Sequence, residues 1–161
     1  MRKILMAGVL GLAMVTSAAS AARRGDVRIQ GQGTIQDGRT FNVSAVLYQD
    51  GTVRGHATLI NRNFTGANGT SPYTLHIDIT CVHQATDGSV FIGGTTRRTN
   101  DPSLVDAVFF SVQDNGRDDL LSRAFFWDDD PNTTGDPSAC QLNNAGDFPM
   151  EEVIRGNINV H

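Results

Sequence analysis

Three Asp-Gly pairs restrict what this chain can fold into more than any other feature of its sequence. They are Asp37-Gly38, Asp50-Gly51 and Asp87-Gly88, and each lies between two segments in which apolar and polar residues alternate. Aspartate and glycine both tolerate the positive φ of a tight turn, so this pair between alternating segments is a strong hairpin signal. The sequence therefore predicts three antiparallel β-hairpins.

The rest of the chain also has the pattern of short strands, and no stretch shows a long helical period. We predict an all-β fold of about eight antiparallel strands in a closed, barrel-like meander, with the last strand returning beside the first. A two-sheet β-sandwich is the alternative, because periodicity does not separate the two architectures. The expected strands cover residues 26–35, 40–49, 52–62, 72–84, 88–98, 106–113, 120–127 and 152–160.

Alternation also predicts which side chains face the core, since successive residues of a strand point to opposite faces. In the fourth expected strand, Cys81 shares the apolar face of Ile77 and Ile79. In the last expected strand, the pattern places Ile154 and Ile158 inward. We therefore expect Cys81 to lie on the core side or at the rim of the fold.

The first residues have the pattern of a secretory signal peptide. Arg2 and Lys3 precede an apolar run at 4–15, and small residues follow as far as Ala21. We predict a signal peptide over 1–21 and a single β-domain over 22–161 that is secreted or periplasmic. The apolar run is too short for a membrane-spanning helix, which needs roughly 20 residues. No second long apolar run is present, so we expect no integral membrane segment in the mature chain.

Charge argues against nucleic acid as a partner. Without Arg2 and Lys3, the chain has 11 basic residues against 17 acidic ones, which gives a formal charge of −6. A net acidic surface repels the phosphates of DNA, RNA and anionic lipids. The sequence names no other partner.

A long segment at 128–150 shows neither a strand nor a helix pattern and contains glycine and several prolines. A loop of that length inside a compact domain is uncommon and is usually functional or tied down. The chain has two cysteines, Cys81 and Cys140, and export would take both to an oxidising compartment. We predict a Cys81–Cys140 disulfide that fastens the loop to the strand over 72–84, with two free thiols as the alternative.

Calcium is the one cofactor that the sequence suggests. Asp128, Asp130 and Asn132 occupy alternate positions, as at the start of a calcium-binding loop, and Asp114 begins a second acidic turn. The match is partial, because threonine and alanine occupy the positions where the motif has glycine and glutamate. The alternative is that these residues simply form turns.

A second candidate metal site combines His56, His76 and Asp78. His76 and Asp78 share the polar face of one expected strand, and His56 lies on the strand before it. Imidazole nitrogens and carboxylate oxygens are common ligands of zinc and related metals. Their spacing matches no recognised metal motif, so the alternative is scattered histidines without a shared function.

Recognised catalytic motifs are missing from the sequence. It contains no G-x-S-x-G, H-E-x-x-H, C-x-x-C or P-loop pattern. The glycines of Gly31-Gln32-Gly33 precede no helix, so they do not form a dinucleotide-binding motif. The sequence assigns no catalytic residue.

Several short motifs recur in one order along the chain: GTI at 33–35, DGTVRGH at 50–56, ITCV at 79–82, FIGG at 91–94, VQDNG at 112–116 and GNINVH at 156–161. In this order the chain resembles a group of small uncharacterised exported bacterial all-β proteins, which have D-G-x-V-x-G, D-N-G and C-terminal G-N-x-x-V-H motifs. The resemblance covers nearly all of 22–161. It implies an exported all-β domain and transfers no catalytic residue.

These observations leave two hypotheses for function. The first is an exported, non-catalytic β-domain that binds a small ligand, glycan, surface or partner, since an eight-stranded barrel can hold a small molecule. The second is a small secreted hydrolase or isomerase whose site combines an acidic loop, at Asp114 or Asp128, with His56 or His76. We favour the first, because the catalytic motifs are missing.

Overall fold

The computed structural model describes residues 25–63, 72–102, 104–126, 135–142 and 148–161. Within these ranges no helix is long and apolar enough to cross a membrane. The predicted signal peptide at 1–21 lies outside the described residues. The elements, in chain order, are β1 (Val27–Ile35), β2 (Thr40–Leu47), β3 (Val53–Asn61), β4 (Tyr73–Gln84), β5 (Ser89–Thr99), β6 (Ala107–Gln113), β7 (Leu120–Ser122), β8 (Phe125–Phe126), the 3₁₀ helix η1 (Pro137–Leu142) and β9 (Met150–Val160).

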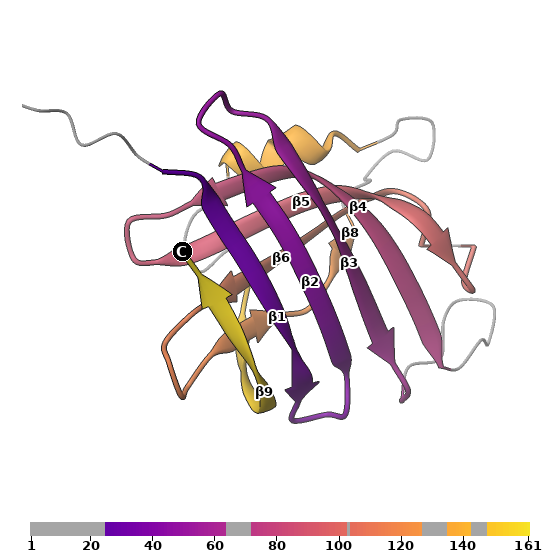
Figure 1. The fold of residues 1–161 in the computed structure, drawn as a ribbon. Helices are drawn as coiled ribbons and strands as arrows, with labels where there is room; N and C mark the ends of the chain where they lie inside the picture. The colour runs from indigo at the N-terminus through magenta and orange to yellow at the C-terminus, as the bar shows by residue number, and fades with distance from the viewer. Residues whose placement is uncertain (1–24, 64–71, 103, 127–134, 143–147) are drawn as a thin grey trace, which may run out of the picture.

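The strands form one antiparallel sheet that closes on itself (Figure 1). Their order is β5-β4-β3-β2-β1-β9-β7-β6-β8, and β5 also pairs with β6. Eight strands therefore make a closed barrel, with β8 as an extra short strand. In Figure 1, β9, β1, β2 and β3 form one wall, and β4, β5 and β6 cross behind it. The predicted barrel is confirmed over the sandwich, and the last strand lies beside the first as expected.

The three predicted hairpins are confirmed. Gly38, Gly51 and Gly88 have φ values of 85°, 83° and 88°, in the left-handed region that glycine adopts at little cost. The aspartate before each glycine accepts a hydrogen bond from the backbone N–H two residues further along, at 3.1, 2.8 and 3.0 Å respectively. This local bonding fixes the turns and thereby the register of the strands that they join.

One predicted strand is interrupted. The sequence predicts a single strand over 120–127, but this range contains β7 and β8 with Arg123-Ala124 between them. Both pieces pair with β6, with registers that differ by one residue. At the break, the Ser122 hydroxyl oxygen accepts a hydrogen bond from the backbone N–H of Ser111 at 2.7 Å. Alternation of apolar residues does not reveal such a change of register.

Apolar side chains from every strand of the closed barrel fill its interior. Burying each large side chain contributes about 1.5–3 kcal/mol, so the interior acts as the packed core of the domain. Ligand sites are therefore expected on the outer surface and at the ends of the barrel. The largest fully buried side chains that face inward are Ile29, Ile35, Val43, Leu75, Ile77, Val82, Val90, Ile92, Phe110 and Ile158.

Two predicted side-chain facings are wrong because of β-bulges: Cys81 does not share the face of Ile79, and Ile154 does not point inward. Between Ile79 and Cys81 the register with β5 shifts, and the extra residue, Thr80, is exposed. Ile79 faces the interior, whereas Cys81 belongs to a second apolar cluster outside the barrel. A bulge adds one residue to a strand, so it reverses the facing of the residues beyond it.

The same effect moves Ile154. In β9 the register with β1 shifts so that Thr34 pairs with Arg155 and Ile35 with Val153, which leaves Ile154 as the extra residue. Its side chain is 57% exposed, whereas Val153 is 6% exposed and faces the core. The prediction that Ile154 points inward is therefore wrong.

The second apolar cluster forms a layer outside β4, β5 and β6. Part of the segment expected to be structureless is η1, which packs on this outer side. A Cβ atom on Gly93 of β5 would lie 2.3 Å from the Pro137 carbonyl oxygen, so glycine is required for this approach. We call this outer side the covered face; its buried residues are Cys81, Phe91, Ala107, Phe109, Cys140 and Phe148.

The predicted disulfide holds the covered face together. Cys81 and Cys140 are bonded, with their Cα atoms 6.1 Å apart and a sequence separation of 59. Beside it, the Gln141 side-chain amide donates to the Val82 carbonyl oxygen at 3.1 Å. Phe148 packs against Phe91 and Phe125, with ring centroids 5.9 and 4.8 Å apart. The disulfide therefore joins η1 to the outer side of the barrel wall.

Candidate ligand-binding face

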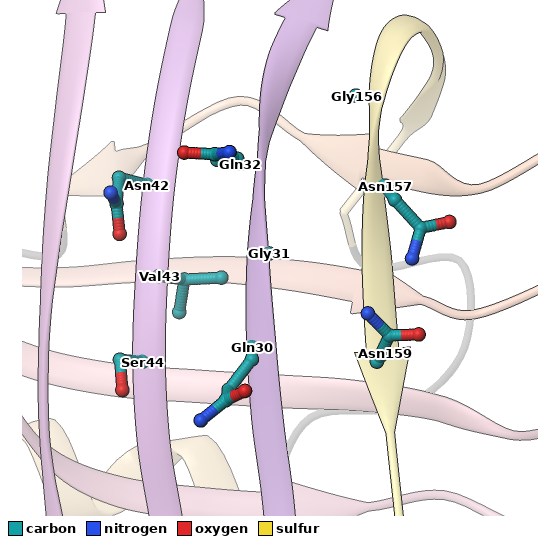
Figure 2. Close-up of a pocket in the computed structure, with 9 residues that line it drawn as sticks. All are labelled: Gln30, Gly31, Gln32, Asn42, Val43, Ser44, Gly156, Asn157 and Asn159. Carbon is teal, nitrogen blue, oxygen red and sulfur yellow. The ribbon is translucent and has the colours of Figure 1, made fainter.

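A groove of about 470 Å³ lies on the outer side of β2, β1 and β9 (Figure 2). Its polar lining consists of amides and one hydroxyl, which come from alternate, outward-facing positions of the three strands. We call it the amide groove. These side chains are Gln30, Gln32, Asn42, Ser44, Asn157 and Asn159, and none of them is charged.

Strand register arranges these side chains in two rows. Gln30 of β1 lies opposite Ser44 of β2 on one side and opposite Asn159 of β9 on the other. Gln32 lies in the same way between Asn42 and Asn157. Figure 2 shows Gln32 extending toward Asn42, and Gln30 extending toward the side of Ser44. Each row therefore presents three polar groups across three strands.

Hydrogen-bonding capacity in the groove is unused by the part of the protein that the structure describes. No hydrogen bond there engages the side chains of Gln30, Gln32, Asn42, Asn157 or Asn159. A carboxamide offers two donors and an acceptor. The groove can therefore both donate to and accept from a ligand without breaking an internal contact.

The predicted transition-metal residues continue these rows. His56 of β3 lies opposite Ser44 on one side and Asp78 of β4 on the other, and Thr58 lies opposite His76. The Thr58 hydroxyl is 3.2 Å from His76 Nδ1. In the described ranges no three histidine, cysteine, aspartate or glutamate side chains are grouped so that they could hold a metal ion. The site stays a prediction.

Asp114, a predicted calcium ligand, is already bonded to the backbone. Its Oδ2 accepts from the N–H of Val160 at 3.0 Å, and its Oδ1 accepts from the N–H of Gly116 at 3.1 Å. Both carboxylate oxygens of Asp114 therefore stabilise the backbone, one at β9 and one within its own turn. Asp128, Asp130 and Asn132 lie outside the described residues, so the calcium hypothesis stays a prediction.

Asp119 makes the same kind of contact and was not expected from the sequence. It is 2% exposed, and its two carboxylate oxygens accept from the N–H groups of Ile158, at 2.7 Å, and Asn115, at 2.9 Å. Strand β9 pairs with β7 over only three residue pairs. Asp114 and Asp119 therefore supply acceptors to β9 where β7 no longer does.

The amide groove was likewise not predicted from the sequence. Its signal was present, because Gln30 and Gln32, and likewise Asn157 and Asn159, stand two residues apart in strands expected to be neighbours. In one strand alone, outward amides are typical of an ordinary solvated surface. Only the register of the strands places the two pairs opposite one another.

No protein-family model, curated protein or solved structure matches the chain.

Proposed function

We propose that this chain is an exported, non-catalytic β-domain that binds a neutral carbohydrate in the amide groove. The observation that carries the proposal is the set of amides, without hydrogen-bond partners in the described residues, that gather in one uncharged groove. Carboxamides and sugar hydroxyls both donate and accept hydrogen bonds, so each can satisfy the other. With no charged side chain in its lining, the groove favours a neutral polyol over an ion.

The spacing of the sheet suits a linear ligand. Neighbouring strands lie about 4.8 Å apart, and outward residues of one strand repeat about every 6.8 Å. A chain of sugar rings lying across the strands would meet one pair of polar groups at each strand. Each hydrogen bond contributes about 0.5–1.5 kcal/mol net. We therefore expect dissociation constants from about micromolar to millimolar.

Two observations support export. The first residues have the pattern of a signal peptide, and Cys81 and Cys140 form a disulfide. Disulfides form and persist in oxidising compartments and are rare in the cytosol. Both observations agree with the resemblance to exported bacterial proteins.

A hydrolase or isomerase site has weaker support. It requires a histidine near an acidic loop, but Asp114 is bonded to β9, and both β1 and β2 separate β9 from His56 on β3. Of the acidic groups named for that site, Asp128 is outside the described residues. The binding proposal needs only side chains whose positions are described.

Titration with neutral oligosaccharides tests the proposal. A panel of gluco-, manno-, xylo- and chito-oligosaccharides is added to the isotope-labelled protein, and amide chemical shifts are followed. We expect at least one member to shift residues of β1, β2 and β9 in a saturable way. Because the contacts are uncharged, the affinity should be nearly the same at low and high salt.

Substitutions in the groove test whether the ligand binds there. Gln32→Ala combined with Asn157→Ala should weaken binding at least tenfold, while the free energy of unfolding changes by no more than about 0.5 kcal/mol. Gln84→Ala, which removes an exposed amide at the end of β4, is the matched control and should leave affinity unchanged. Equal losses in both variants, or no binding by any member of the panel, would overturn the proposal.

A further inference from the structure

A second, smaller pocket lies at one end of the barrel, away from the amide groove. Its volume is about 210 Å³. It is formed where the β1–β2 turn, the end of β3, the start of β4 and the break between β7 and β8 meet. The lining residues are Asp37, Arg39, Asn61, Tyr73, Leu104, Arg123, Ala124 and Phe126.

Two arginines in this pocket are held by one carboxylate. Glu151 Oε2 accepts from Arg39 Nη2 at 2.6 Å, and its Oε1 accepts from Arg123 Nε at 2.9 Å. Asp37 Oδ2 accepts from Arg39 Nε at 2.6 Å. The Arg39 side chain is 10% exposed, so its orientation is fixed by two ion pairs that are partly shielded from water.

Several hydrogen-bond donors in this pocket have no partner among the described residues. All four carboxylate oxygens of Asp37 and Glu151 already accept a hydrogen bond. By contrast, no hydrogen bond within the described ranges engages Nη1 of Arg39, either terminal nitrogen of Arg123 or the amide nitrogen of Asn61. A ligand in this pocket therefore meets donors without a partner in the described residues, and carboxylate oxygens that each already accept one hydrogen bond.

The opposite side of the pocket is apolar. Leu104, Ala124 and Phe126 line it, and all three also pack against the barrel core. Tyr73 is 8% exposed, and burial raises the pKa of its phenol while Arg39 opposes the rise, so the ring enters the pocket as a neutral group. The pocket thus combines an apolar wall with a donor-rich wall.

We propose that this end pocket binds a small organic monocarboxylate with a compact apolar body. The carboxylate would accept from Arg39 and Arg123, and the apolar body would lie against Leu104 and Phe126. Hydrogen bonds between a guanidinium and a carboxylate are about twice as strong as neutral ones, and arginine can bind both oxygens at once. The mouth of a barrel is a common position for such a site. This site is separate from the amide groove, so it stands or falls independently of the carbohydrate proposal.

Benzoate is a suitable probe, with benzamide and benzylammonium as matched ligands that keep the ring and change the charge. Binding is measured by calorimetry and by chemical shifts of Asn61, Ala124 and Phe126. We expect benzoate to bind at least tenfold more tightly than benzamide, and benzylammonium not to bind detectably. High salt should weaken benzoate binding, unlike carbohydrate binding at the amide groove.

Two arginines on the protein give a matched comparison. Arg123 and Arg97 are 64% and 65% exposed, and each lies in one ion pair, with Glu151 and Asp78 respectively. Arg123→Gln should weaken benzoate binding at least tenfold, whereas Arg97→Gln should leave it unchanged. Leu104→Ser, which alters the apolar wall and keeps both guanidiniums, should weaken benzoate several-fold. Equal binding of benzoate and benzamide, equal effects of the two arginine variants, or no benzoate binding would overturn the proposal.

Discussion

The wall of this barrel has two outer faces that differ in what lies over them. Outside β4, β5 and β6, the covered face carries phenylalanines and is overlaid by η1 through the Cys81–Cys140 disulfide. Outside β9, β1 and β2, the amide groove carries glutamines and asparagines with no internal partner in the described residues. Both parts of the wall contribute inward side chains to the same core. The outward positions alone make one part a packed layer and the other an open groove.

This difference separates outward-facing residues that stabilise the fold from outward-facing residues that are available for binding. Burial of Phe91 and Phe109 contributes about 1.5–3 kcal/mol each, so the covered face strengthens the fold. An exposed amide that bonds only to water contributes almost nothing to folding. Stability therefore does not require amides at Gln30 or Asn157, and their alignment in two rows is the reason to assign them a ligand.

Of the changes to the covered face, removal of the disulfide should have the largest effect on stability. In the chain-entropy model, a bond that closes about 60 residues stabilises the fold by about 4 kcal/mol. Cys81→Ala combined with Cys140→Ala should lower the free energy of unfolding in urea by about that amount. Detached η1 would also uncover phenylalanines, so we expect stronger binding of a hydrophobic dye. An unchanged free energy of unfolding would show that packing alone holds η1 in place.

A pair of glycine variants separates the packing of η1 from the disulfide. Gly93→Ala puts a methyl group 2.3 Å from the Pro137 carbonyl oxygen and forces η1 outward, while Gly25→Ala adds one where no atom lies within 4 Å. Overpacking of this kind costs about 1–3 kcal/mol. Only Gly93→Ala should increase dye binding with the disulfide intact. Similar behaviour of the two variants would argue against close packing of η1.

In the part of the wall that carries the amide groove, the stability of β9 should depend on the carboxylate of Asp119 and not on the disulfide. Asparagine keeps the shape of this buried side chain but replaces one acceptor oxygen with a donor that would face the Ile158 or the Asn115 N–H. An unpaired buried donor costs about 1–3 kcal/mol. Asp119→Asn should lower the free energy of unfolding by about 2 kcal/mol and speed hydrogen exchange along β9.

Asp118 provides the matched control for this prediction. It is the preceding residue in the same turn, its side chain is exposed, and no hydrogen bond to its carboxylate is seen in the described residues. Asp118→Asn should leave both the stability and the exchange rates of β9 unchanged. If Asp118→Asn destabilises the protein as much as Asp119→Asn, general charge in the turn matters and not the specific bond to β9.

Most of the fold could be predicted from local patterns. Asp-Gly turns fixed three hairpins because the turn itself requires the positive φ of Gly38, Gly51 and Gly88. Alternation located the strands of the barrel to within two residues, except that the predicted strand over 120–127 is divided into β7 and β8. The disulfide could be inferred because the chain has two cysteines and is expected to be exported. Each of these inferences depends on neighbours in sequence or on a unique pair.

Features set by register could not be predicted in the same way. Single extra residues, Thr80 and Ile154, reverse the facing of the strand residues beyond them, and alternation cannot show where a bulge occurs. For this reason alternation alone places Cys81 on the same face as Ile77 and Ile79, whereas it lies on the opposite one. The amide groove and the contacts of Asp119 depend on which residues of distant strands lie opposite one another. Such contacts require the closed barrel and are absent from any one strand.

The smallest expected effect on stability concerns Glu151. Its carboxylate joins β9, in the part of the wall that carries the amide groove, to Arg39 and Arg123. The hydrogen bond from Arg123 is the main cause that lowers the pKa of this carboxyl, and bonding from Arg39 adds to it against the opposing effect of burial. A carboxyl with a lowered pKa stabilises the fold above its unfolded value, near pH 4.5, and loses that contribution as pH falls through the folded value. Arg123 is 64% exposed, so solvent screens the pair and we expect no more than about 1 kcal/mol. Glu151→Gln should therefore be less stable than the natural protein by about that amount at neutral pH, and the difference should shrink as pH falls below 4.5 and disappear once the pH is below the folded pKa. Melting curves of both proteins across this pH range measure it. A difference that persists in acid would show that Glu151 acts through packing and not through its charge.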